Sequence, residues 1–181
     1  MATTRILLGI ICFAATGSSG MFNRNLLKQQ KILITRKEII LIASKEVGVR
    51  EKTGNNDGRE VESYLKLTGL QKGYPWCAAF VSWVYSKNGL SKPRSAWSPD
   101  LFPSSRLTTT PLPGDLLGIY FPSMKRIAHV GIVERIHTDW VYSIEGNTNN
   151  VGGREGDGVY RKMRHLKSIR KFSNWINGGS Q

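Results

Sequence analysis

The stretch that most constrains the fold is residues 73–89, Gly-Tyr-Pro-Trp-Cys-Ala-Ala-Phe-Val-Ser-Trp-Val-Tyr-Ser-Lys-Asn-Gly. Pro75 is tolerated just before a helix but not inside one. From Cys77 onward, apolar residues recur at the i, i+3, i+4, i+7, i+8 spacing of one helix face: Cys77, Phe80, Val81, Val84 and Tyr85. Gly89 follows, and glycine readily adopts the left-handed conformation that ends helices. The stretch therefore predicts a buried helix with a cysteine in its first turn.

Cys77 has two interpretations. Unpaired N–H groups and the positive end of the helix dipole stabilise a thiolate at a helix N-terminus, and a thiolate is a nucleophile. Free cysteine is also among the most buried residue types, so a purely structural thiol is the alternative. The residues further along the chain decide between the two.

The composition is that of an ordinary globular protein. Of 181 residues, 40% are hydrophobic and 22% are charged, which suffices for one domain with a core plus a tail. The sequence has no run of about eighteen apolar residues, so we expect no transmembrane segment.

The chain is strongly basic, with a net charge of +13 that is concentrated in residues 24–37, 87–94 and 161–171. Such a surface attracts polyanions, which include nucleic acid, anionic membranes and anionic cell-wall polymers. The basic segments lack zinc-finger spacing, a Gly-rich phosphate loop and an RNA-binding aromatic pair. We therefore expect no specific nucleic-acid binding.

Residues 1–20 resemble a secretory signal peptide, with Arg5, an apolar run and a small-residue segment in that order. We expect a secreted or periplasmic protein, or a cytoplasmic one if translation starts at Met21. The residue before Cys12 is large, which argues against lipidation. The mature chain would keep Cys77 as its one thiol, and a lone thiol in an exported protein needs an explanation.

The remaining chain is expected to be a basic arm, residues 21–34, followed by one domain, residues 35–181. A capping box at Thr35–Glu38 predicts the first helix of this domain, and a second helix is expected over 59–68. Residues 91–113 contain five prolines and are expected to be a long surface loop. Four segments then alternate with the period of strands: 115–121, 127–136, 140–144 and 159–164. The predicted fold class is α+β, with N-terminal helices packed on a C-terminal antiparallel sheet.

The second and third of these predicted strands carry candidate catalytic groups. Alternation places His129, Gly131 and Val133 on one face of their strand. Val141, Ser143 and Glu145 share a face of the next strand, which a hairpin at 137–139 joins to the first. His129 and Glu145 can therefore be cross-strand neighbours, and Gly131 leaves room for another element, such as the helix of Cys77. Together they offer a nucleophile, a base and an orienting carboxylate. Alternatively, the histidine and the glutamate are ordinary strand residues.

Four motifs resemble the CHAP domain, the family of cysteine, histidine-dependent amidohydrolases and peptidases: Tyr74-Pro75-Trp76-Cys77-Ala78-Ala79-Phe80-Val81, Pro113-Gly114-Asp115, Ala128-His129-Val130-Gly131-Ile132-Val133 and Ile144-Glu145-Gly146-Asn147. The resemblance implies a papain-like fold and cleavage of an amide bond in bacterial peptidoglycan or its peptide fragments. It also implies that Cys77 is the nucleophile, His129 the base and Glu145 the third member. Asn147 is then a further polar group that supports the histidine.

Substrate contacts are expected from a polar loop and from aromatic side chains: Asn55, Asn56, Tyr74, Trp76 and Trp97. The oxyanion donors are expected to be the Cys77 N–H and a side chain from Gln71 or Tyr74. No metal or other cofactor is expected, because the histidines and the cysteine have no ligand spacing. Two alternatives stay open, an amidase or peptidase on a non-wall substrate and an inactive module that binds the wall or a partner.

Overall fold

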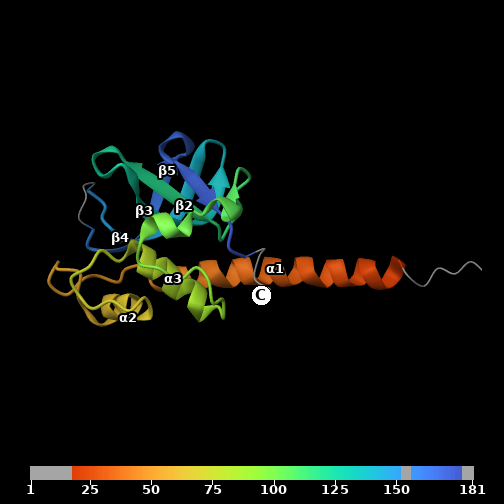
Figure 1. Cartoon of the computed structure of the whole chain (residues 1–181), viewed down its shortest axis with the longest axis horizontal. Coiled ribbons are helices and arrows are strands. Elements are labelled where there is room, and N and C mark those ends of the chain that lie inside the picture. Colours follow the sequence, from red (N-terminus) through yellow and green to blue (C-terminus); the bar gives the residue numbers. More distant parts are fainter. Residues whose placement is uncertain (1–17, 152–155, 177–181) are drawn as a thin grey trace, which may run out of the picture. The chain divides into compact units, whose positions relative to one another are not determined.

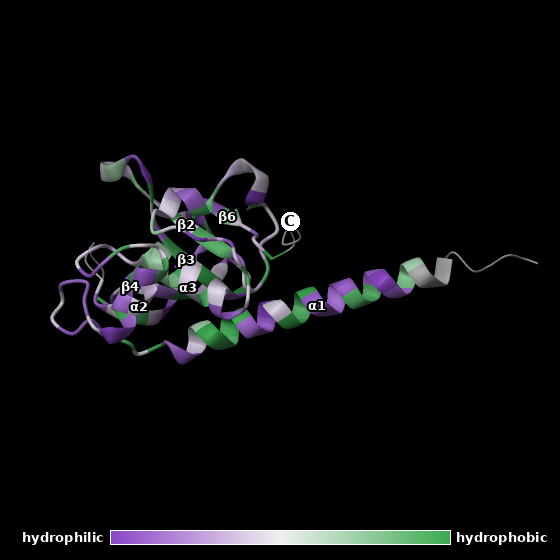
Figure 2. Ribbon diagram, turned by 60° about the horizontal axis from the view of Figure 1, so that its bottom comes forward, coloured by the Kyte–Doolittle hydropathy of each residue, from purple (hydrophilic) through white to green (hydrophobic). Residues whose placement is uncertain are grey.

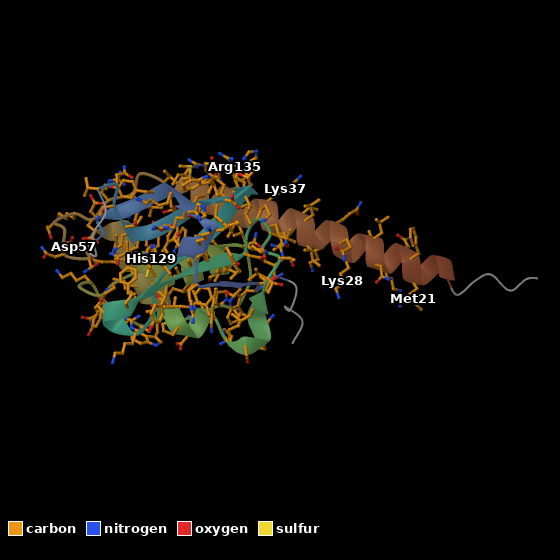
Figure 3. All side chains as sticks on the ribbon, turned by 90° about the horizontal axis from the view of Figure 1, so that it is seen from above. Met21, Lys28, Lys37, Asp57, His129 and Arg135 are labelled. Carbon is orange, nitrogen blue, oxygen red and sulfur yellow. The ribbon has the colours of Figure 1, made fainter. Side chains whose placement is uncertain are left out.

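The computed structural model describes residues 18–151 and 156–176, and it describes side chains from residue 21 onward (Figure 1). The predicted signal segment 1–20 lies almost wholly outside the described residues. The chain divides into two units, residues 1–31 and residues 32–181. In the first unit the described residues are helical and every side chain from 21 to 31 is exposed. Figure 3 shows Met21 and Lys28 projecting away from this helix.

The first helix, α1 (Ser18–Lys45), begins well before the predicted capping box at Thr35–Glu38. No helix was predicted over 21–34, yet the segment is helical, because it contains no Gly or Pro and is rich in Leu, Lys, Gln and Ile. Glu38 does not cap a helix start but accepts a hydrogen bond from Asn88 Nδ2 at 2.9 Å. Figure 2 shows that α1 alternates between hydrophilic and hydrophobic bands along its length.

The described residues form three α-helices and one six-stranded sheet, which confirms the α+β class. After α1 come α2 (Arg59–Leu67) and α3 (Cys77–Lys87). The strands are β1 (Leu107–Thr108), β2 (Leu116–Phe121), β3 (Arg126–His137), β4 (Trp140–Thr148), β5 (Gly158–His165) and β6 (Lys171–Ser173). They are ordered β1-β6-β2-β3-β4-β5, and every neighbouring pair is antiparallel.

Two parts of the predicted sheet differ from the structure. β4 runs on to Thr148, four residues beyond the predicted end, and so includes Glu145 well within the strand. The proline-rich loop 91–113 contains two 3₁₀ turns, Ser98–Leu101 and Ser104–Arg106, and the edge strand β1. Short 3₁₀ turns accept proline near their start, which is why this segment is ordered despite its composition.

The core lies between the helices and one face of the sheet. Alternate strand residues face opposite sides, so Leu116 and Ile132 join the helix-side core whereas Leu117 and Val133 join a smaller cluster on the other face. α3 contacts α2, β3 and β4, and it lies between α2 and the sheet (Figure 1). Eight of its eleven residues are buried, as the apolar spacing from Cys77 predicted.

Close packing of α3 against the sheet depends on a glycine, but not on the predicted one. A Cβ on Gly146 would lie 2.7 Å from a Trp76 ring carbon and 2.8 Å from Phe80 Cγ, so Gly146 admits the α3 segment. A Cβ on Gly131 would instead lie 2.5 Å from Cγ of Glu145. The space over Gly131 is therefore filled by the carboxylate side chain of the neighbouring strand, and not by the helix of Cys77.

Candidate active site

Cys77 is the first residue of α3, where N–H groups lack intrahelical acceptors and the helix dipole is positive. The residue is 5% exposed, and it is the one free cysteine of the described residues. Its Sγ lies 3.4 Å from Oγ of Ser98, a buried serine in the first 3₁₀ turn of the proline-rich loop. The loop thus brings a hydroxyl to the sulfur.

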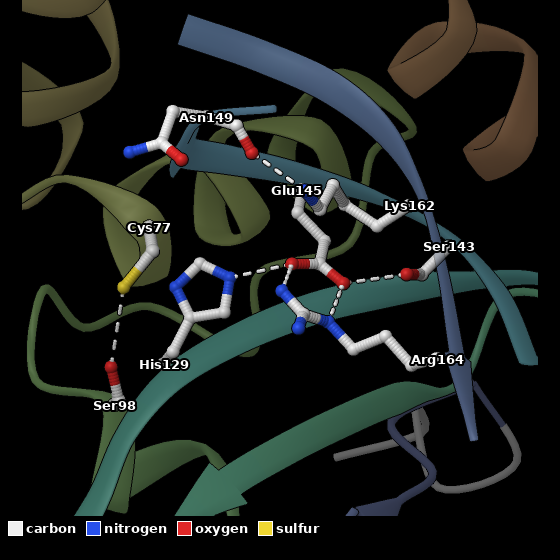
Figure 4. Close-up of polar contacts among 8 residues, drawn as sticks. All are labelled: Cys77, Ser98, His129, Ser143, Glu145, Asn149, Lys162 and Arg164. Atoms are coloured by element: carbon white, nitrogen blue, oxygen red, sulfur yellow. Dashed lines mark hydrogen bonds and ion pairs between the residues drawn. The ribbon is translucent and has the colours of Figure 1, made fainter. Parts of the chain in front are cut away.

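His129 lies beside Cys77 and connects it to Glu145 (Figure 4). The Nε2–H of His129 donates to Oε2 of Glu145 at 2.7 Å, and the other ring nitrogen is on the side of the sulfur. The pairing of Ile132 with Ile144 in the β3–β4 register puts His129 two residues beyond Glu145's direct neighbour. His129 and Glu145 are therefore diagonal neighbours across the hairpin, within reach of long side chains.

Glu145 is fully buried, and all of its described partners are donors. Oε1 accepts from Ser143 Oγ at 2.6 Å and from Arg164 Nε at 2.7 Å, whereas Arg164 Nη2 donates to Oε2 at 2.6 Å (Figure 4). Neither Ser143 nor Arg164 was among the predicted site residues. Arg164 belongs to the basic segment 161–171, which we expected to form a charged surface.

These contacts favour a thiolate–imidazolium pair. Burial raises the pKa of Cys77, but His129 and, to a lesser extent, Ser98 outweigh it and leave the pKa of the thiol lowered. Burial lowers the pKa of His129, yet its interactions with Cys77 and Glu145 raise that pKa to about 9. Against the burial of Glu145, Arg164 and His129 hold the pKa of its carboxyl well below its usual range. The arrangement supplies a charged nucleophile, a proton donor and a fixed carboxylate.

A second polar network surrounds Glu51 and includes three residues predicted for other roles, Asn56, Trp76 and Asn147. Glu51 Oε1 accepts from Trp76 Nε1 at 2.8 Å, and Glu51 Oε2 accepts from the Asn56 N–H at 2.8 Å. The Asn147 amide donates to Asn56 Oδ1 at 3.0 Å, and more distantly to Glu51 Oε1 at 3.4 Å. Asn147 therefore connects the 51–57 loop to the end of β4. We had expected it to support the histidine instead. The side chain of Trp76 is wholly buried in the core and has no surface with which to contact a substrate.

The other predicted contact residues are exposed. Tyr74 and Trp97 are 53% and 50% exposed, and Trp97 stacks beneath the guanidinium of Arg126, 3.8 Å from its ring centroid. Asn55 points to its own loop, where its amide donates to Thr53 Oγ1 at 2.9 Å. Gln71 is also exposed, and no contact of its side chain distinguishes it from Tyr74 as an oxyanion donor.

Two features are absent from the part of the chain that the structure describes. Its His, Cys, Asp and Glu side chains form no group of three or more that could hold a metal ion. None of its helices is long and apolar enough to cross a membrane.

A cysteine at a helix N-terminus, in line with a histidine and a buried carboxylate, is the arrangement found in cysteine hydrolases. Residues 69–147 match the CHAP domain family, the family that the sequence motifs resemble. CHAP domains are generally hydrolases that act as amidases or peptidases. The matched segment holds Cys77, His129 and Glu145, whereas Arg164 lies beyond it.

Comparison with solved structures gives a distant likeness to the crystal structure of Ly7917, at 15% sequence identity and a TM-score of 0.47. The match covers 79% of this chain and 63% of that one, so this chain corresponds to less than two thirds of Ly7917. No match to a curated protein is found.

Proposed function

We propose that this chain hydrolyses an amide bond in bacterial peptidoglycan, with Cys77 as nucleophile, His129 as acid and base, and Glu145 as the orienting carboxylate. The observation that supports this best is the position of His129 between the sulfur and a buried, charged carboxylate. The match of residues 69–147 to the CHAP family supports the substrate class.

The reaction follows from these positions. The Cys77 thiolate attacks the amide carbonyl, and the His129 imidazolium gives its proton to the departing amine, which leaves a thioester. The neutral imidazole then takes a proton from water, which attacks the thioester and releases the acid and the free thiolate. The first-turn N–H groups of α3 are suited to stabilise the oxyanion in both halves. Glu145 fixes the ring and its tautomer throughout.

The test is wall lysis by single variants. Cys77→Ala and His129→Ala should each lower the rate of turbidity loss of purified walls by about a thousandfold or more, because a nucleophile and its base act as one unit. His137→Ala is the matched control, since His137 is an exposed histidine at the end of β3 and should keep full activity. Wild-type lysis by Cys77→Ala would refute the mechanism.

Mass spectrometry of the digested wall identifies the bond. New amino termini on stem peptides released from the glycan indicate cleavage at muramic acid, and new termini inside the peptides indicate an endopeptidase. A protein whose Cys77 is rapidly alkylated but which creates no new termini acts on another amide. Slow alkylation with no new termini indicates an inactive binding module.

A further inference from the structure

The carboxylate at the end of the proposed catalytic line is shared between two cations. Glu145 is wholly buried, and a buried charge is costly unless it is paired and hydrogen-bonded. Arg164 contacts both of its oxygens, through Nε to Oε1 at 2.7 Å and through Nη2 to Oε2 at 2.6 Å. This two-point geometry is the strong form of the arginine–carboxylate contact. Oε2 is also the atom that accepts from His129.

We propose that Arg164 is a positioning residue of this site, which shares the Glu145 carboxylate with His129 and keeps the imidazole a working acid and base. It touches neither the sulfur nor the reacting atoms, so it acts only through Glu145. Ser143 completes the arrangement, because its hydroxyl occupies Oε1 and prevents the carboxylate from turning. The inference deepens the proposed function and depends on it for its catalytic meaning.

There is a chemical reason for Arg164 and His129 to share the Glu145 carboxylate. A general acid works best when its pKa lies near the working pH, since it has to release its proton to the leaving amine. An unneutralised carboxylate in a buried site would hold the imidazolium strongly and make this release slow. The guanidinium of Arg164 places a second positive charge next to the same carboxylate and therefore weakens the attraction between Glu145 and the imidazolium. It also keeps Glu145 ionised, so that the proton is not transferred to the carboxylate.

The other charged and polar groups near His129 do not replace Arg164. From α3 comes the sulfur of Cys77, and from β4 come Glu145 and Ser143. β5 contributes Arg164, whereas the ammonium of Lys162 on the same strand donates to the Asn149 carbonyl at 2.6 Å. On β2 the residue paired with His129 is the apolar Ile119.

The experiment compares Arg164→Gln, Arg164→Lys and Arg161→Gln. Arg161 is the matched control, because it lies on the same strand and pairs with a carboxylate, Glu134, but is half exposed. The readout is the pKa of His129, measured by NMR titration of the labelled imidazole in the full chain. Arg164→Gln should raise this pKa by about one unit, a tenfold change in proton affinity, and Arg164→Lys should raise it less, because the charge remains but the two-point contact is lost.

In wall lysis, Arg164→Gln should lower kcat about tenfold or more at neutral pH with KM unchanged, and Arg164→Lys should recover part of the loss. The control should match the wild type in both measurements. An unchanged or lowered His129 pKa in the folded Arg164 variants would overturn the proposal, and Arg164→Lys alone decides this if Arg164→Gln does not fold. The titration needs no substrate. A wild-type chain that fails to cut walls would therefore refute the proposed function without deciding the role of Arg164.

Discussion

At the scale of single residues, the reactivity of Cys77 results from a balance between burial and two neighbours. Burial alone favours the neutral thiol, because a thiolate loses its hydration in the interior. The imidazole of His129 and the hydroxyl of Ser98 reverse this preference and leave the pKa of Cys77 below its ordinary value. The thiol should therefore stay reactive at pH values where an unperturbed cysteine, with a pKa of about 8.5, is mostly protonated.

The contribution of Ser98 can be isolated. Ser98→Ala removes the hydroxyl 3.4 Å from Sγ and with it one stabilising contact of the thiolate. The pKa of Cys77 should rise, by about one unit or less because sulfur is a weak hydrogen-bond acceptor. The measurement is the rate of alkylation of Cys77 by iodoacetamide as a function of pH, where the midpoint of the variant should move to higher pH.

Ser104→Ala is the control for Ser98→Ala, because Ser104 starts the second 3₁₀ turn of the same loop and is exposed. Its alkylation profile should coincide with that of the wild type. A Ser98→Ala profile that also coincides with the wild type would show that the hydroxyl does not stabilise the thiolate.

At the scale of elements, two glycines allow the site to assemble. Gly131 on β3 leaves room for the Glu145 side chain, and Gly146 on β4 leaves room for Trp76 and Phe80 of the α3 segment. Neither requires glycine for its backbone conformation, because neither has a positive φ. Both are glycine because a neighbour occupies the place of their Cβ. A methyl group at each should therefore disturb a different part of the site.

Gly131→Ala and Gly146→Ala should have separable effects. Each methyl overpacks a buried contact and should cost about 1–3 kcal/mol of unfolding free energy, measured by thermal or denaturant unfolding. Gly131→Ala displaces Glu145, so the pKa of His129 should fall from about 9 toward its ordinary value. Gly146→Ala displaces the start of α3, so Cys77 alkylation should slow while the His129–Glu145 contact remains. Identical changes of both readouts in the two variants would contradict this division.

The parts of the site that were predictable are those encoded by local periodicity. The spacing after Cys77 gave α3, and the period of two placed His129 and Glu145 on adjacent strands. Arg164 and Ser98 could not be found in this way. In the β4–β5 register Arg164 pairs with Val141 and Glu145 with Tyr160, so Arg164 meets Glu145 only by reaching along the sheet. Ser98 arrives on a loop without periodicity. A fully buried carboxylate is costly unless a positive charge pairs with it. A buried Glu145 therefore predicts a nearby basic side chain, and this was the signal available for Arg164.

At the scale of the whole molecule, charge is the dominant property. The chain carries 26 Lys and Arg residues against 13 Asp and Glu residues. Some of the described cations have specific partners, such as Arg36 with Asp115 in the core and Arg161 with Glu134 on the surface. At most half of the basic side chains can each have an acidic partner within the chain, because there are twice as many basic as acidic side chains. The remaining field acts on whatever polyanion is near.

If the substrate is a bacterial wall, this excess should hold the protein on the wall's anionic polymers. Retention on purified walls, measured by co-sedimentation of Cys77→Ala so that the wall stays intact, should fall steeply as NaCl is raised. The screening length shrinks from about 30 Å at 0.01 M to about 3 Å at 1 M, so long-range attraction is lost. Walls stripped of their phosphate polymers should retain less protein at low salt and show a flatter salt dependence. Retention that is equal at both salt concentrations would mean that the wall is held by contacts other than charge, which would leave the net charge of +13 without a role in wall binding.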